Sequence, residues 1–286
     1  MVPGDVAPHC FSTFDPTGDS SMKLHLIALA GLLAASGAAQ AKIDNGLNSP
    51  GNGELFLSVW DNNGTAEAAD DRSYTRDLGI TLNDFASALA SPVAVAPQPT
   101  FSFAADALMT SFLGQTSDLG NLRWNVAGFD AFSADRAALT VATGFAGSTQ
   151  TYAQFRGWSG GAATHLAAVN PLGDNTSNAI NASGTATSAD GNAYSGGVIW
   201  GNNIGGKADF ANDGGIGDSL GIWMFYETVA SGSTTTKVKQ LDLANFATLS
   251  ADGGLLITPV PEPETYALML AGLGLVGFMA RRRKAA

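Results

Sequence analysis

The sequence predicts a single, mainly β domain with one or two short helices, arranged as an antiparallel β-sandwich or a jelly roll. Glycine is abundant, with 35 residues in a chain of 286, where an average composition would give about 20. Charged residues make up only 14% of the chain, against about a quarter in an average soluble protein. Short apolar segments alternate with stretches rich in glycine, serine and asparagine, which is typical of strands joined by turns.

Apolar alternation locates the expected strands. In the segment ELFLSVW (54–60), large apolar residues occupy both sets of alternating positions, which predicts a strand that is covered on both sides. Further strands are expected at 122–127, 138–143, 197–200 and 219–229. Near the end of the domain, the apolar segments 247–250 and 255–258 flank Ala251-Asp252-Gly253-Gly254, which predicts a hairpin.

Two segments have the character of short helices. The first is 82–89, with Asn83 near its N-cap, and the second is 102–113, where Ser102 can cap the helix and Gly114 can end it. Between 157 and 217 the chain is dominated by small and polar residues, so we expect long surface loops there. No repeat of fixed period is present, which argues against solenoids and propellers.

Composition excludes several classes of function. The chain has one cysteine, Cys10, and three histidines, of which His9 and His25 lie at or before the N-terminal apolar segment. A processed protein would keep only His165, so disulfide scaffolds, thiol nucleophiles and Cys/His zinc sites are excluded. The net charge is −11, and the few basic residues are scattered, so we expect no nucleic-acid partner.

The N-terminal region resembles a secretory signal. From Met22 the chain reads MKLHLIALAGLLAASGAAQA, with an early lysine, a short apolar core and an A-x-A site before Lys42. We therefore predict a signal peptide at 22–41, removed by signal peptidase. Residues 1–21 carry aspartates, prolines and glycines, so we expect them to be an upstream extension, with translation starting at Met22.

The predicted domain spans 42–258 and is followed by a C-terminal segment, 259–286, that has three parts. The first is a spacer that contains Val260, Pro261, Glu262 and Pro263. The second is the apolar segment 266–280, which as a helix would be about 22 Å long, short of the roughly 30 Å hydrocarbon core, and would form a marginal transmembrane helix. The third is a basic stop of Arg281, Arg282, Arg283 and Lys284, which would keep the tail cytoplasmic.

This three-part tail resembles a PEP-CTERM sorting signal, the substrate of exosortase in Gram-negative bacteria. The resemblance implies that the protein is held in the inner membrane, cut near Pro-Glu-Pro, and then released or transferred to the cell surface, commonly alongside exopolysaccharide production. The partners that it implies are the membrane and exosortase, with exopolysaccharide as a further candidate. It implies nothing about the activity of residues 42–258.

One motif resembles a catalytic one. Gly157-Trp158-Ser159-Gly160-Gly161 fits G-x-S-x-G, the turn that exposes a nucleophilic serine in α/β-hydrolases. The available base is His165, and no acidic residue lies between it and Ser159. The order Ser, acid, His therefore fails, and we expect no serine-hydrolase site.

Two acidic segments offer oxygen ligands of the kind that calcium prefers. The first runs from Asp61 and Asn63 to Asp71, and the second runs from Asp213 to Asp218. Both depart from known calcium loops in spacing, so an ordinary turn is the alternative for each. Without cysteine and with one histidine, any bound cation should be calcium rather than a transition metal, and no other cofactor is expected.

Tryptophans and carboxylates are the remaining candidates for glycan binding and for glycosidase chemistry. Trp158 and Trp200 stand beside glycines and could stack on sugar rings, with burial in the core as the favoured alternative. The other three tryptophans, Trp60, Trp124 and Trp223, continue strand patterns and should be core. Glu227 ends an apolar segment and is the acid that we expect to be most desolvated. No pair of carboxylates stands out as glycosidase machinery.

These observations favour an exported, exosortase-processed, non-enzymatic protein of the cell surface or exopolysaccharide matrix. Two alternatives remain open. One is a secreted enzyme that acts on polysaccharide through aspartate or glutamate, and the other is a calcium- or glycan-binding module.

Overall fold

The computed structural model describes residues 42–46, 53–61, 68–89, 99–130, 136–176, 181–227, 233–259 and 270–273. The chain divides into two compact units, 1–39 and 40–286, and all described residues belong to the second. The predicted signal peptide and upstream extension lie outside the described residues.

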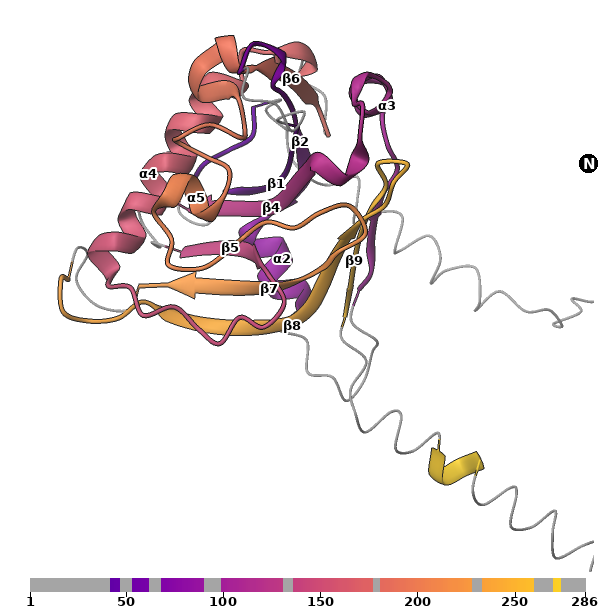
Figure 1. The fold of residues 1–286 in the computed structure, drawn as a ribbon. Helices are drawn as coiled ribbons and strands as arrows, with labels where there is room; N and C mark the ends of the chain where they lie inside the picture. Colours follow the sequence, from indigo (N-terminus) through magenta and orange to yellow (C-terminus); the bar gives the residue numbers. More distant parts are fainter. Residues whose placement is uncertain are drawn as a thin grey trace, which may run out of the picture. The chain divides into compact units, whose positions relative to one another are not determined.

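Nine strands form one antiparallel, curled sheet in the order β3-β9-β8-β7-β5-β4-β1-β2-β6 (Figure 1). The strands are β1 (Glu54–Asp61), β2 (Arg72–Thr81), β3 (Phe101–Phe103), β4 (Leu122–Asp130), β5 (Arg136–Val141), β6 (Ser183–Thr187), β7 (Ser219–Tyr226), β8 (Lys239–Leu249) and β9 (Leu255–Pro259). The helices are α2 (Leu82–Leu89), α3 (Ala107–Gln115), α4 (Tyr152–Val169) and α5 (Asn203–Gly206), with 3-10 turns η1 (Ala68–Asp70), η2 (Leu119–Asn121), η3 (Gly173–Thr176) and η4 (Ser188–Ala193). The mainly β, antiparallel prediction is confirmed, but the strands form one sheet instead of the two sheets of a sandwich.

Both faces of the sheet are packed, as the alternation in β1 predicts. Leu55, Leu57 and Val59 enter one apolar cluster together with residues of α2 and α3. Phe56 enters a second cluster on the opposite face, beneath α4. A central strand that buries large side chains on both sides is strongly held in register, because a shift by one residue would exchange the two sets.

Helix α4 replaces part of the surface loop that we expected between 157 and 217, so that prediction is wrong. The helix begins after Thr151, whose backbone N–H donates to the Gln154 side chain at 2.8 Å, an arrangement of the capping-box type. The helix was not predictable from the sequence because it contains three glycines, each of which lowers helix propensity. Gly161 has a packing reason, because a Cβ there would lie 3.1 Å from the Ile199 carbonyl oxygen.

Helix α3 bridges the two ends of the curled sheet. It starts at Ala107 and is capped by Asp106, whose Oδ1 accepts from the Met109 N–H at 2.7 Å. The Asp106 Oδ2 also accepts from the Tyr74 hydroxyl on β2 at 2.8 Å. At the other end of the sheet, Gly253 in the β8–β9 turn lies so close to Met109 that no Cβ would fit. The predicted helix at 102–113 is therefore real, but its cap is Asp106, because Ser102 lies in β3.

Several other expectations have clear outcomes. The helix at 82–89 and the strands at 54–60, 122–127, 138–143, 219–229 and the final hairpin are confirmed in type, whereas 197–200 is not a strand. Among the described residues, no helix is long and apolar enough to cross a bilayer. Of the expected membrane helix at 266–280, only 270–273 is described, as one helical turn.

Candidate functional site

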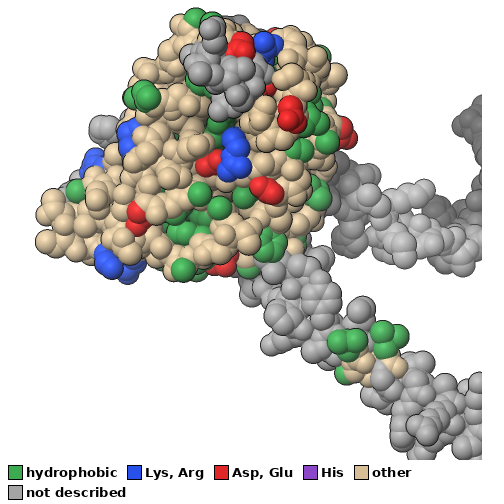
Figure 2. Space-filling model, in the orientation of Figure 1, with side chains coloured by type: hydrophobic (Ala, Val, Ile, Leu, Met, Phe, Trp, Pro, Cys, Tyr) green, Lys and Arg blue, Asp and Glu red, His purple; other side chains and the backbone are tan. Residues whose placement is uncertain are grey.

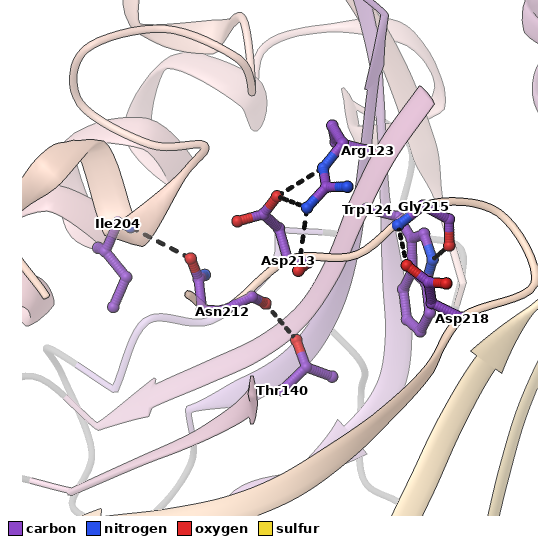
Figure 3. A network of polar contacts seen from close by, with 8 residues as sticks. All are labelled: Arg123, Trp124, Thr140, Ile204, Asn212, Asp213, Gly215 and Asp218. Carbon is purple, nitrogen blue, oxygen red and sulfur yellow. Dashed lines mark hydrogen bonds and ion pairs between the residues drawn. The ribbon is translucent and has the colours of Figure 1, made fainter. Parts of the chain in front are cut away.

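A loop that runs over β4 holds one of the two predicted calcium segments (Figure 3). Trp124 and Gly214 form an antiparallel bridge, with backbone N–H to oxygen distances of 2.9 and 3.0 Å. The Thr140 hydroxyl donates to the Asn212 carbonyl oxygen at 2.8 Å and accepts from the Val126 N–H at 3.0 Å. The loop thus continues the ladder on β4 where β5 ends, which fixes its backbone.

The carboxylate of Asp213 in this loop forms an ion pair with Arg123. Its Oδ2 lies 2.7 Å from Nη2 of Arg123 and accepts from the Arg123 Nε at 2.8 Å. The Asp213 side chain is 3% exposed and that of Arg123 is 41% exposed. Both guanidinium nitrogens bind the same carboxylate oxygen, so the hydrogen-bonding capacity of Oδ2 is used by a charge-assisted contact within the protein.

Asp218 has a different task in the same loop. Its Oδ2 accepts from the Gly215 N–H at 2.7 Å, and the Gly215 carbonyl accepts from the Trp124 ring N–H at 2.7 Å. Figure 3 shows Asp213 directed at Arg123 and Asp218 at Gly215. The two carboxylates therefore stabilise the loop through separate partners, which is the turn alternative that the sequence left open.

The other predicted calcium segment is only partly described, since Asn63 lies outside the described residues. Asp61 is fully buried. The pKa of Asp71 is raised, first by burial and then by the charges of Asp70 and Asp61, so these three acids lie near one another. In the part of the chain that the structure describes, no group of three or more histidine, cysteine or acidic residues is placed to hold a metal ion. Calcium binding stays a prediction.

Trp158 and Trp200 are both fully buried, which is the core alternative that the sequence favoured over stacking on sugar rings. The Trp200 ring N–H donates to the Ser58 hydroxyl at 3.1 Å, and that of Trp158 to the Lys207 carbonyl at 3.2 Å. Each indole therefore has the partner that a buried Trp requires. Neighbouring glycines suggested exposed loops, but Gly157 lies inside α4, and Gly201 has a φ of +97° with the Ser195 carbonyl oxygen 2.8 Å from where a Cβ would be. Of the three expected core tryptophans, Trp60 and Trp124 are buried and Trp223 is partly buried.

The serine-hydrolase motif lies inside a helix. Ser159 is in the middle of α4, where no strand-to-helix turn exposes its hydroxyl. His165 is fully buried, stacks on Trp200 with 5.6 Å between ring centroids, and holds the Asn192 carbonyl oxygen 2.8 Å from Nδ1. Burial lowers the pKa of His165 to about 4. A neutral ring sealed in the core cannot reach a substrate, which agrees with the failed residue order.

Sequence reasoning missed Glu54, the acid with the most informative surroundings. The pKa of Glu54 is raised to about 8, mainly by burial and then by the charge of Asp77, while the hydrogen bond from the Asp44 backbone N–H opposes the shift. That N–H donates to the Glu54 Oε2 at 2.7 Å. Burial also raises the pKa of Asp77. Paired carboxyls with raised pKa values are typical of acid–base sites, although structural pairs also produce them. Glu227, the acid expected to be desolvated, directly follows β7 and is partly buried.

A groove of about 260 Å³ lies between α3 and β6. Leu108, Phe112 and Ala186 give it an apolar lining, and Asp190 adds a carboxylate. Arg72 closes one side by donating from Nη1 to the Gln115 Oε1 at 2.5 Å. Residues that line it come from segments far apart in the sequence, so no local pattern could predict it.

The first described residues are fixed to the domain. Ile43 is 2% exposed, its N–H donates to the Asn170 Oδ1 at 3.0 Å, and its carbonyl accepts from the Asn170 Nδ2 at 3.2 Å. The Glu54 N–H donates to the Asp44 carbonyl at 2.7 Å. The fold therefore begins within two residues of the predicted signal-peptidase cut before Lys42.

Comparison with known proteins identifies the other end of the domain. Residues 259–284 match the family model of the PEP-CTERM protein-sorting motif. No curated protein and no solved structure matches the chain. The motif begins at Pro259, which is also the last residue of β9. The chain therefore carries a PEP-CTERM sorting motif that starts at the end of β9, the last strand among the described residues, and is an exported protein targeted to exosortase.

Proposed function

We propose that this protein is a non-enzymatic domain of the cell surface or exopolysaccharide matrix, delivered by its tail and freed by exosortase. The observation that carries the proposal is the position of the motif, which starts where β9 ends. A cut at Pro261–Pro263 would leave every described strand of the sheet in one piece. The tail can thus act as a removable address without contributing to the fold.

The N-terminal end supports the same interpretation. Signal-peptidase cleavage before Lys42 would leave Ile43 in its buried place, held by Asn170. Both proposed cuts therefore flank the folded domain. Delivery would consume the two terminal signals, and residues 42–258 would remain as the product.

Surface character supports a passive role without nucleic acid. On the face drawn in Figure 2, Lys and Arg side chains are few and separated, and uncharged surface dominates. With Trp158 and Trp200 buried, the groove between α3 and β6 is the place where the alternative of glycan binding would act. For the alternative of a polysaccharide-acting enzyme, Glu54 and Asp77 are the pair with suitably shifted pKa values.

A processing experiment tests the delivery step. We compare the parent chain with P261A/E262A and with the matched control E264A/T265A, in cells that contain an exosortase. Membrane fractionation and intact-mass measurement should find the first variant uncut in the inner membrane, and the control cut like the parent. Equal masses and locations for all three proteins would show that Pro-Glu-Pro is only a spacer.

A second experiment tests the non-enzymatic part. The purified domain is screened against a polysaccharide panel for release of reducing ends, beside Glu54→Gln and the surface control Asp118→Asn. We expect no turnover from any of them. Turnover that Glu54→Gln abolishes while the control keeps it would establish the enzyme alternative instead.

A further inference from the structure

Exposed apolar side chains gather on the last two strands of the domain. Among described residues 42–259, five large apolar side chains are at least 36% exposed. Three of them, Leu241 (53%), Phe246 (39%) and Leu256 (42%), belong to β8 and β9. Leu241 pairs with Met224, a member of the apolar cluster under α2 and α3, whereas Phe246 pairs with Gly221, which points to the other side of β7. Leu241 therefore lies on the opposite face of the sheet, and Phe246 and Leu256 are the exposed apolar pair that indicates a contact surface.

Phe246 and Leu256 lie on the same face of the sheet. Leu256 pairs with Thr248 on β8 and with Ser102 on β3, and Phe246 pairs with Thr258. Directly opposite residues point to the same side of a sheet. We name these five residues the β8–β9 face. None of these five residues is charged, and the exposed Asp242, which pairs with Trp223, lies on the same side of the sheet beyond the bulge in β8.

The position of the tail limits what can cover this face. β9 ends at Pro259, and the apolar segment of the sorting signal starts at Tyr266. The six residues between them reach at most about 25 Å when fully extended. The strand that carries Leu256 is thus the part of the domain tied most closely to the membrane before cleavage.

We propose that the β8–β9 face rests on the lipid surface of the inner membrane while the uncut tail anchors the protein. This rests on the proposed function, which requires a membrane-held precursor. Two partly exposed apolar side chains alone would bind lipid weakly, but a short tether raises their effective concentration at the surface to about the millimolar range. Cleavage removes the tether, so the same contact would be lost on release.

The test places single fluorescent labels on the full chain in nanodiscs of phosphatidylethanolamine and phosphatidylglycerol, without exosortase. Cys10 is replaced by serine, and one cysteine is introduced as Leu256→Cys or Thr248→Cys on the face, or as the control Ala167→Cys on the exposed side of α4. Each cysteine carries an environment-sensitive dye, and quenching by brominated lipid is measured. Thermal unfolding checks that each labelled protein keeps the fold of the parent.

We expect at least twofold stronger quenching at 248 and 256 than at 167. Equal quenching at all three positions, or none at 248 and 256 in chains that are incorporated into nanodiscs, would overturn the proposal. If labels at 248 and 256 are not quenched and light scattering shows that the protein self-associates, the face would instead be assigned to contact with a second copy of the chain. Failure of the chain to enter nanodiscs would contradict the membrane-held precursor itself, so the two failures are distinguishable.

Discussion

One face of the sheet has two very different halves. Over β1, β4, β5 and β7 it is covered by α4 and the following loops, which bury Trp158 and Trp200 completely. Over β8 and β9 the same face continues, but Phe246 and Leu256 are 39% and 42% exposed. The cross-strand pair of Gly221 and Phe246 joins the halves. We call the part over β1, β4, β5 and β7 the covered half and the part over β8 and β9 the bare half. The covered half contributes core packing and therefore stability, whereas the bare half adjoins the tail and is available for contact.

The largest effect should come from emptying the covered half. Trp158→Ala removes a ring that packs edge-on against Phe155, Phe210 and Phe225. We expect a loss of about 3–5 kcal/mol in the free energy of unfolding, as is usual for large aromatic truncations in cores. Phe246→Ala on the bare half should cost about 0.5 kcal/mol or less. Urea unfolding of both variants measures this, and similar losses would show that the two halves do not differ.

Acid should weaken the covered half through His165. Its pKa is lowered to about 4 in the folded protein by burial, compared with about 6.5 in an unfolded chain. The folded state therefore binds fewer protons, and stability is lost as pH falls from 6.5 to 4, by about 3 kcal/mol in total. Unfolding measured over this range should have a shallower pH slope in His165→Gln. An unchanged slope would mean that carboxyl groups alone cause the acid sensitivity.

If calcium binds the domain, it should raise the free energy of unfolding by a smaller amount. A cation that binds only the folded state stabilises it by about 2.7 kcal/mol at a hundredfold excess over Kd. We expect a raised melting temperature in calcium that both Asp61→Asn and Asp218→Asn weaken, because each substitution removes a carboxylate from one of the two acidic segments. Calorimetry in calcium chloride and in sodium chloride of equal ionic strength measures whether calcium itself raises the melting temperature. No difference between the salts would reduce both acidic segments to ordinary turns.

A more local effect is expected at the first residues of the domain. Asn170→Ala removes two hydrogen bonds to the backbone of Ile43, at a cost of about 1–2 kcal/mol. Amide exchange at residues 43 and 44 should accelerate, while exchange in β8 and β9 should stay as in the parent. Equal acceleration in both places would show that the N-terminal attachment supports the whole sheet.

Strands with apolar alternation were predictable, and polar strands were not. β2 (Arg72–Thr81) has few large apolar residues, yet Ser73 and Thr75 are buried. The reason is a polar cover: the Ser195 N–H donates to the Ser73 hydroxyl at 3.0 Å, and the Ser195 and Thr75 hydroxyls lie 3.1 Å apart. A strand that buries hydroxyl groups against a polar loop has no hydrophobic period to detect.

The candidate sites divide in the same way. The sorting motif is linear, so its residues could be recognised without the fold. Burial of Trp158, the pKa shift of Glu54 and the groove beside α3 depend on segments that meet only in the folded protein. A glycine beside a tryptophan is compatible with a surface loop and with a tight core, and local sequence does not distinguish them.

The pairing of β3 with β9 places a condition on the timing of export. Phe101 pairs with Ile257 and Phe103 with Leu255, so β3 must wait for a partner that follows about 150 residues later. A chain that crosses the membrane N-terminus first exposes β3 early, and the entropy of closing so long a loop delays its pairing. The described sheet can be completed only when residue 259 emerges. The sorting motif begins at that residue, so a chain that stalls or is truncated earlier would have neither a finished sheet nor a sorting signal.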